Sequence, residues 1–306
     1  MKQVRRVIFE GRRGRRDDAT ARVRRPRATK LVARVPRLAR SGRVVLVDKY
    51  GGRSRMSRVV RVARAPKAPS MDIAPGSRFF YGGRRRPSVT LTTARSGTAR
   101  VELLSEETGA VVRTWTVQSR PGQASTVAWD GSGPAGIQQL GSYRFRVAPG
   151  TASARVSAAS SGQSFLFADH LFPIRGRHNL GYSQTNNFGG ARNHKGQDMF
   201  ARCGTRLAAA RGGRVQYAGY HRYAGYYAVI DGAETGVDYV YMHMRRPALV
   251  ETGDRVFTGQ KLGEVGETGR ATGCHLHFEM WSAPGWYEGG SAFDPLPALR
   301  GWDSYS

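Results

Sequence analysis

The sequence predicts an all-β protein, mainly antiparallel, that is built from more than one folded unit. Its 306 residues are about two to three times the length of a typical domain. Thirty-nine glycines and fourteen prolines separate many short valine-rich runs, which favours strands and turns over long helices. Hydrophobic residues make up 40% of the chain, enough for packed cores. We expect three β-rich units joined by two linkers, and no transmembrane segment, because no apolar run approaches the ~18 residues needed.

The positive charge lies mostly at one end of the chain. Of the formal net charge of +27, residues 1–70 contribute +19, residues 71–170 contribute +5 and residues 171–306 contribute +3. Arginine accounts for 43 of the 49 basic residues, a ratio that codon bias in a GC-rich genome explains as easily as selection for phosphate contacts. We expect non-specific polyanion contact through the basic N-terminal unit. We expect no specific nucleic acid as a binding partner, because no recognition motif accompanies the charge.

The first unit is expected at residues 1–64. Residues 31–35 and 43–47 are apolar runs suited to strands, and residues 49–52 suit a hairpin turn. Residues 1–10 are basic but hold no apolar core of 7–15 residues, so they do not form a secretory signal peptide. Either the protein is cytoplasmic or this start is not the biological one. The stretch resembles the later strands of an IPT/TIG-type immunoglobulin-like domain, possibly truncated, although any small β-sandwich has the same pattern.

A second β unit is expected at residues 78–149, between linkers at residues 65–77 and 150–164 that are rich in small residues and show no periodicity. It holds five short alternating runs, and residues 106–109 suit a hairpin turn. Trp129-Asp130-Gly131 and a final strand at residues 141–144 resemble the Ig-like domain of flagellar hook-capping proteins. Such domains space and present other modules, so they do not indicate an activity.

The third unit, residues 165–306, contains all seven histidines. Three segments stand out: NHKGQD at residues 193–198, YMHM at residues 241–244 and GCHLHFE at residues 273–279. Residues two apart on a strand face the same side. His275 and His277 therefore share one face of a predicted strand, while Leu276 and Phe278 face the core.

Residues 172–299 resemble the lysostaphin-type (LytM-like) zinc metallopeptidases, Peptidase family M23, which cut peptides in bacterial cell walls. Besides the histidine segments, the resemblance includes FPI at residues 172–174, a Cys-Gly-Thr turn at 203–205 and a glycine-spaced run leading into HLHFE. It implies one zinc ion per chain, with the ligands His194, Asp198 and His277, and it implies that His243 and His275 are the catalytic histidines.

Three further residues bear on this site. Glu279 shares the strand face of His277 and is either a carboxylate that orients this ligand or a solvated strand-end residue. Cys274 adjoins His275 and so points away from the zinc face. With Cys203 it forms either a disulfide, which implies an oxidising compartment, or a pair of buried free thiols.

The resemblance implies a zinc-dependent endopeptidase that hydrolyses peptidoglycan stem or cross-bridge peptides outside the cytoplasm, in the cell wall or periplasm. The pattern does not distinguish a bond between D-Ala and a diamino acid from a glycine bridge. One alternative is a non-catalytic wall-binding or amidase-activating protein on the same fold. Another is a polyanion-binding protein that acts through the basic N-terminal unit.

Overall fold

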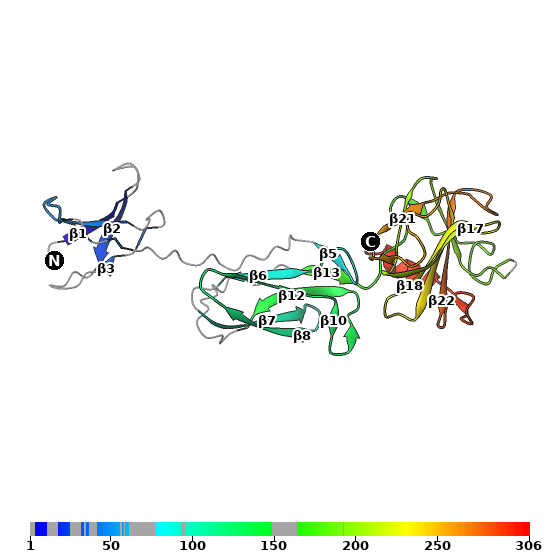
Figure 1. The fold of residues 1–306 in the computed structure, drawn as a ribbon, viewed down its shortest axis with the longest axis horizontal. Coiled ribbons are helices and arrows are strands. Elements are labelled where there is room, and N and C mark those ends of the chain that lie inside the picture. The colour runs from blue at the N-terminus through cyan, green and yellow to red at the C-terminus, as the bar shows by residue number, and fades with distance from the viewer. Residues whose placement is uncertain are drawn as a thin grey trace. The chain divides into compact units, whose positions relative to one another are not determined.

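The structure is a computed structural model, drawn in Figure 1, and it divides into two compact units at residues 1–66 and 67–306. It describes residues 4–10, 18–24, 32–33, 35–36, 42–55, 57, 59–60, 77–92, 96–148, 164–191 and 193–306. Its sheets are antiparallel apart from one parallel pair of strands, and the described residues contain one α-helix. The all-β prediction is therefore confirmed. No helix within the described ranges is long and apolar enough to cross a membrane.

The first unit contains a four-stranded sheet in the order β3-β2-β1-β4. The strands are β1 (Val4–Phe9), β2 (Ala19–Arg24), β3 (Val32–Ala33) and β4 (Val44–Asp48). Val7, Phe9 and Val45 are buried on this sheet. The predicted turn at 49–52 forms because Asp48 Oδ1 accepts the backbone N–H groups of Tyr50 and Gly52, both at 2.8 Å. The described residues of this unit form one sheet, so the sandwich stays a prediction.

The compact unit at residues 67–306 contains both the second and the third of the predicted units, and these two names are kept below. The second unit consists of two packed layers. One is a five-stranded sheet in the order β5-β13-β12-β7-β8, and the other pairs β6 with β9. The strands of these layers are β5 (Arg78–Phe80), β6 (Ser88–Thr92), β7 (Gly97–Ser105), β8 (Val111–Ser119), β9 (Ala124–Ala128), β12 (Gly141–Val147) and β13 (Phe165–Ala168). Two short strands, β10 (Ser132–Gly133) and β11 (Gly136–Ile137), pair only with each other. Both layers bury apolar side chains in one core around Trp129, whose indole N–H donates to the Ser132 carbonyl at 2.7 Å.

Strand β13 differs from the sequence-based boundary, which placed residues 165–168 at the start of the third unit. In the structure it pairs with β12 on one side and β5 on the other. The physical reason is the pattern of the strand itself, because Phe165 and Phe167 are both buried in the core around Trp129. These four residues therefore complete the sheet of the second β unit.

The remaining chain forms a large sheet in the order β14-β15-β22-β19-β18-β17-β20, with β23 also paired to β22. Its elements are β14 (His178–Asn179), β15 (Gln197–Ala201), β17 (Gly213–His221), β18 (Gly225–Gly232), β19 (Val237–Met244), β20 (Arg255–Val256), β22 (His275–Ser282) and β23 (Ala292–Phe293). Two short strands, β16 (Arg206–Ala208) and β21 (Lys261–Glu264), pair separately. Helix α1 (Leu296–Asp303) packs Leu299 and Trp302 into the main core.

The alternation of β22 separates the core of this domain from its functional face. Leu276, Phe278 and Met280 are buried in the main core. The intervening residues, His275, His277 and Glu279, point to the opposite face and line a groove there. The period of two along the strand thus places apolar and ionisable side chains on different sides of one sheet.

Candidate metal centre

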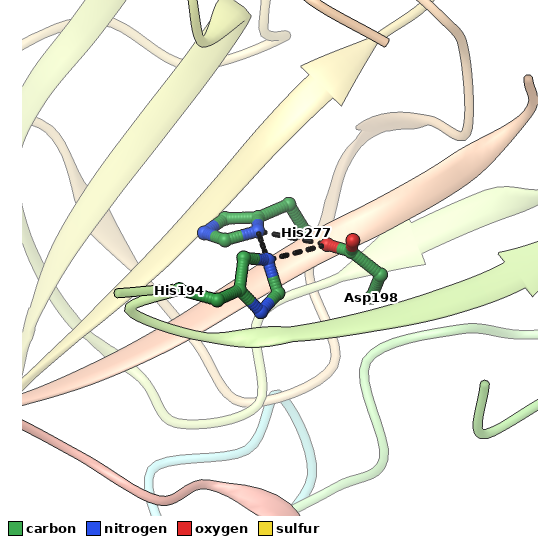
Figure 2. Close-up of side chains that lie close together, drawn as sticks. All are labelled: His194, Asp198 and His277. Atoms are coloured by element: carbon green, nitrogen blue, oxygen red, sulfur yellow. Dashed lines mark hydrogen bonds and ion pairs between the residues drawn. The ribbon is translucent and has the colours of Figure 1, made fainter. Parts of the chain in front are cut away.

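Two neighbouring strands and one loop bring the three predicted metal ligands together. In the pairing of β15 with β22, Asp198 lies directly opposite His277, so their side chains share a face. His194 reaches the same point from the loop that precedes β15. Figure 2 shows the three side chains converging, although His194 and His277 are 83 residues apart in the chain.

The three side chains present their donor atoms to one point. Asp198 Oδ1 lies 2.8 Å from His277 Nδ1 and 3.2 Å from His194 Nε2. The two imidazole nitrogens are 3.0 Å apart. Donor atoms at zinc distances of 2.0–2.2 Å from one ion stand about 3.3 Å apart in a tetrahedral site. The observed triangle is therefore close to the size that a small divalent cation requires.

The outer nitrogens of both imidazoles show which inner atoms carry lone pairs. His194 Nδ1 lies 3.1 Å from the Asn187 carbonyl, and His277 Nε2 lies 2.8 Å from Glu279 Oε1. Carbonyl and carboxylate oxygens only accept, so these outer nitrogens donate their protons. In their neutral forms, which a bound metal ion requires, the two imidazoles present lone pairs at His194 Nε2 and His277 Nδ1. Without a metal ion, protons on these inner nitrogens donate to Asp198 Oδ1 instead. Two nitrogen lone pairs and a carboxylate oxygen facing one another fit a bound metal ion.

Glu279 is a buried partner of His277, which settles the choice left open by the sequence. The residue is 5% exposed. Its Oε2 accepts the indole N–H groups of Trp281 at 2.7 Å and Trp286 at 3.2 Å. With Oε1 on His277, both carboxylate oxygens have donors, as a buried charge requires. The two tryptophans hold the carboxylate in place behind the predicted ligand.

The electrostatics of this cluster favour positive charge between the carboxylates. Burial opposes ionisation of Asp198, but hydrogen bonds from His194 and His277 outweigh it and hold the pKa of Asp198 well below its usual range. Burial also opposes a charge on His277, yet hydrogen bonds to Asp198 and Glu279 prevail and raise its pKa to about 9.

The two predicted catalytic histidines are not part of the donor triangle but lie beside it. The ring centroids of His243 and His275 are 4.6 Å apart, and His275 Nε2 is 3.7 Å from Asp198 Oδ1. His243 Nδ1 donates to the Thr268 carbonyl and His275 Nδ1 donates to the Gly273 carbonyl, both at 2.8 Å. Each ring therefore keeps Nε2 as its free acceptor when neutral.

His243 combines backbone strain with a strongly shifted pKa. Its φ is +62°, in the left-handed region that side-chain-bearing residues rarely adopt. Such strain clusters at functional sites. Burial, together with the nearby His275, lowers the pKa of His243 to about 4. The ring is neutral at pH 7 and able to accept a proton.

A groove of about 830 Å³ gives access to these side chains. Its lining includes all five predicted site residues, His194, Asp198, His243, His275 and His277. It also includes Arg270, Trp286 and Tyr287. Arg270 lies in the glycine-spaced run that leads into HLHFE, but nothing in that run marks it as a site residue, and the two aromatic residues belong to no motif. Near the β17–β18 turn, Tyr223 and Tyr227 line the groove.

The disulfide alternative is confirmed. Cys203 and Cys274 are bonded, with Cα atoms 5.2 Å apart, within the range that a disulfide requires. Cys203 lies in the loop that follows β15, and Cys274 is the residue immediately before β22. The disulfide therefore links the two strands that carry Asp198 and His277.

Comparisons with known proteins identify the family of the region that contains this site. Residues 192–295 match Peptidase family M23. Peptidoglycan DD-endopeptidase ShyC of Vibrio cholerae is 42% identical over 87 residues, 28% of this chain and 20% of that protein. The L-Ala–D-Glu endopeptidase of Bacillus subtilis is 32% identical over 149 residues, 45% of each chain. The glycyl-glycine endopeptidase ALE-1 of Staphylococcus capitis is 36% identical over 115 residues, 35% of this chain and 29% of that protein.

Among solved structures, the catalytic domain of lysostaphin from Staphylococcus simulans is 30% identical, with 40% of this chain and 92% of that chain covered at a TM-score of 0.35. The match to each of the three curated relatives spans less than half of that relative's length. The third unit thus carries a Peptidase family M23 domain at residues 192–295, which confirms the resemblance to lysostaphin-type peptidases. The resemblances of the two upstream units stay predictions.

Proposed function

We propose that this protein is a zinc-dependent endopeptidase that hydrolyses peptide bonds in bacterial peptidoglycan. The observation that carries the proposal is the donor triangle of His194, Asp198 and His277, in which one nitrogen of each imidazole meets a carboxylate oxygen while the other nitrogen is held by an acceptor. Three protein ligands leave a fourth position open, which distinguishes catalytic zinc from structural zinc. The three curated relatives are all named as endopeptidases.

In the proposed mechanism, His194, Asp198 and His277 would hold a zinc ion in the groove. When bound, zinc supplies Lewis acidity toward the attacking water and the scissile carbonyl. His243 and His275 stand beside this point with Nε2 free. One of them takes the proton of the attacking water at Nε2. The protonated ring then becomes a donor, to the oxyanion that forms on the carbonyl and afterwards to the leaving amine.

The proposed location is outside the cytoplasm, in the cell wall or periplasm. Peptidoglycan lies there, and disulfides such as Cys203–Cys274 persist in oxidising compartments.

The proposal is tested by digesting purified peptidoglycan with the protein, with and without a chelator, followed by mass analysis of the released fragments. We expect new amino termini in the stem or bridge peptides, lost on chelation and restored by zinc. The control variant His178→Ala changes a histidine that does not line the groove and should release the same fragments.

The alternative of a non-catalytic wall-binding or amidase-activating protein makes a different prediction. Such a protein would bind peptidoglycan without releasing fragments, and His243→Ala would change nothing. Zinc content together with the effect of His243→Ala therefore separates the two functions.

A further inference from the structure

Arg270 lies on the wall of the groove with its charge uncompensated. It is exposed and lines the same groove as the predicted metal ligands and catalytic histidines. Within the described part of the chain its guanidinium forms no ion pair or hydrogen bond. Among the arginines that the structure describes, Arg270 is the one that lines this groove.

The backbone that carries Arg270 is held firmly against the β17–β18 hairpin. Thr268 donates its hydroxyl proton to the Met244 carbonyl at 2.6 Å and accepts the Tyr226 N–H at 3.0 Å. Gly269 has a φ of +77°, and a Cβ there would lie 2.2 Å from the backbone nitrogen of Gly225. The Arg270 N–H then donates to the Tyr223 carbonyl at 2.9 Å. Arg270 therefore has a fixed backbone and follows Thr268, whose carbonyl orients His243, by two residues.

The acidic groups of the groove do not neutralise this charge. Asp198 is engaged by His194 and His277, and Glu279 is buried behind His277 with both of its oxygens bonded. The remaining described lining is largely aromatic or apolar and includes Tyr227, Met242 and Trp286. With a divalent cation on the three ligands, the groove carries a net positive charge and an unpaired guanidinium.

We propose that Arg270 binds a carboxylate of the substrate peptide next to the scissile bond. The inference rests on the proposed function and names its substrate class: peptides with a free carboxylate, as glutamate and diamino-acid residues of stem peptides carry, rather than uncharged glycine bridges. A guanidinium binds a carboxylate through two parallel N–H···O bonds, a geometry that lysine reproduces only as a point charge. One curated relative is named as an L-Ala–D-Glu endopeptidase and another as a glycyl-glycine endopeptidase. In this chain, Arg270 selects the peptides that carry a free carboxylate over glycine bridges.

The test compares two synthetic stem peptides that differ only in whether the side-chain and α-carboxyl groups are free or converted to amides. Cleavage of each is measured with the zinc-loaded full chain and with Arg270→Gln, Arg270→Lys and the control Arg177→Gln. Arg177 is an exposed arginine that does not line the groove. Binding of the free-acid cleavage product is measured in parallel by calorimetry, as a readout that needs no turnover.

We expect wild-type kcat/KM to favour the free acid by about tenfold or more, the scale of one charge-assisted contact. Arg270→Gln should abolish this preference mainly through KM, Arg270→Lys should keep part of it, and Arg177→Gln should keep all of it. Equal cleavage of both peptides by the wild type, or an unchanged preference in Arg270→Gln, would overturn the inference. If the wild type cleaves neither peptide, the proposed function fails, and product binding that Arg270→Gln leaves intact would then refute the role of Arg270 separately.

Discussion

His277 lies between two carboxylates, with Asp198 Oδ1 2.8 Å from its Nδ1 and Glu279 Oε1 2.8 Å from its Nε2. A neutral imidazole has one proton to donate, and the buried Glu279 can only accept. In the neutral ring the proton therefore belongs on Nε2, and Nδ1 carries the lone pair that faces Asp198 and His194. In the protonated ring, Nδ1–H donates to Asp198 Oδ1. Glu279 thus decides which nitrogen of His277 is available for a metal ion.

Glu279→Gln should keep the metal with reduced affinity, because the amide oxygen still accepts from His277 but without charge. Glu279→Leu should bind zinc about 10–100-fold more weakly, the usual cost of losing such a partner. Competition with a fluorescent chelator measures both affinities. The exposed Glu251→Gln should match the wild type, and an undiminished affinity in Glu279→Leu would contradict the positioning role.

The wild-type chain should bind one zinc ion, and His194→Ala or Asp198→Ala should lose it. Each substitution removes one corner of a triangle whose sides measure 2.8–3.2 Å. Elemental analysis after dialysis measures the occupancy, and His178→Ala is the matched control outside the groove. Full zinc occupancy in either variant would mean that the ligand assignment is incorrect.

His243→Ala and His275→Ala should keep zinc and lose most turnover, by on the order of 10²-fold or more. Neither ring belongs to the donor triangle, so metal content separates their role from that of the ligands. Single-turnover assays on a defined peptide, paired with zinc analysis, provide the measurement. If both variants retain activity, proton transfer uses another group.

Replacing Cys203 and Cys274 by serine should destabilise the third unit and weaken zinc binding together. The bridge spans 71 positions of the chain, for which loop entropy gives roughly 4 kcal/mol as an upper value. Hydrogen exchange read by peptide separates this unit from the upstream sheets, whose protection should not change. Unaltered exchange and zinc affinity would show that the bridge does not support the site.

The second β unit should lose stability in acid through Glu102. This buried carboxylate accepts from Arg146 Nε at 3.0 Å and from Arg100 at 2.8 Å. Hydrogen bonds from Arg146 lower the pKa of Glu102 below its ordinary value of 4.5, although burial opposes this shift. The positive charges of Arg146 and Arg100 lower the pKa further.

Because the unfolded chain takes up the proton first, the stabilisation by Glu102 is complete above pH 4.5 and is lost as the pH falls through the folded pKa. Glu102→Gln should lower stability at pH 7, by on the order of 1 kcal/mol or more, and flatten its acid dependence. Hydrogen exchange across residues 97–147 at several pH values measures this, with the exposed Glu107→Gln as control. An unchanged pH slope in Glu102→Gln would contradict the assignment.

The sequence by itself determined the fold class and the grouping of the site. Alternation along residues 275–279 predicted that Leu276 and Phe278 enter the core while His275 and His277 face outward, and both apolar side chains are fully buried. Strand periodicity is a local property, so it survives whatever the strand pairs with. The family resemblance carried by the motif segments named the residues that meet in the groove.

Other features depended on which strands become neighbours. The sequence could not place Phe165 and Phe167 in the sheet of the second unit, because their partners on β12 and β5 lie beyond the linker and far back in the chain. Nor could it choose between a solvated and a buried Glu279, because Trp286, from the loop after β22, helps to enclose that carboxylate. The position of Arg270 on the groove wall has the same origin. Burial and charge pairing are properties of the assembled neighbourhood, and only the tertiary structure supplies it.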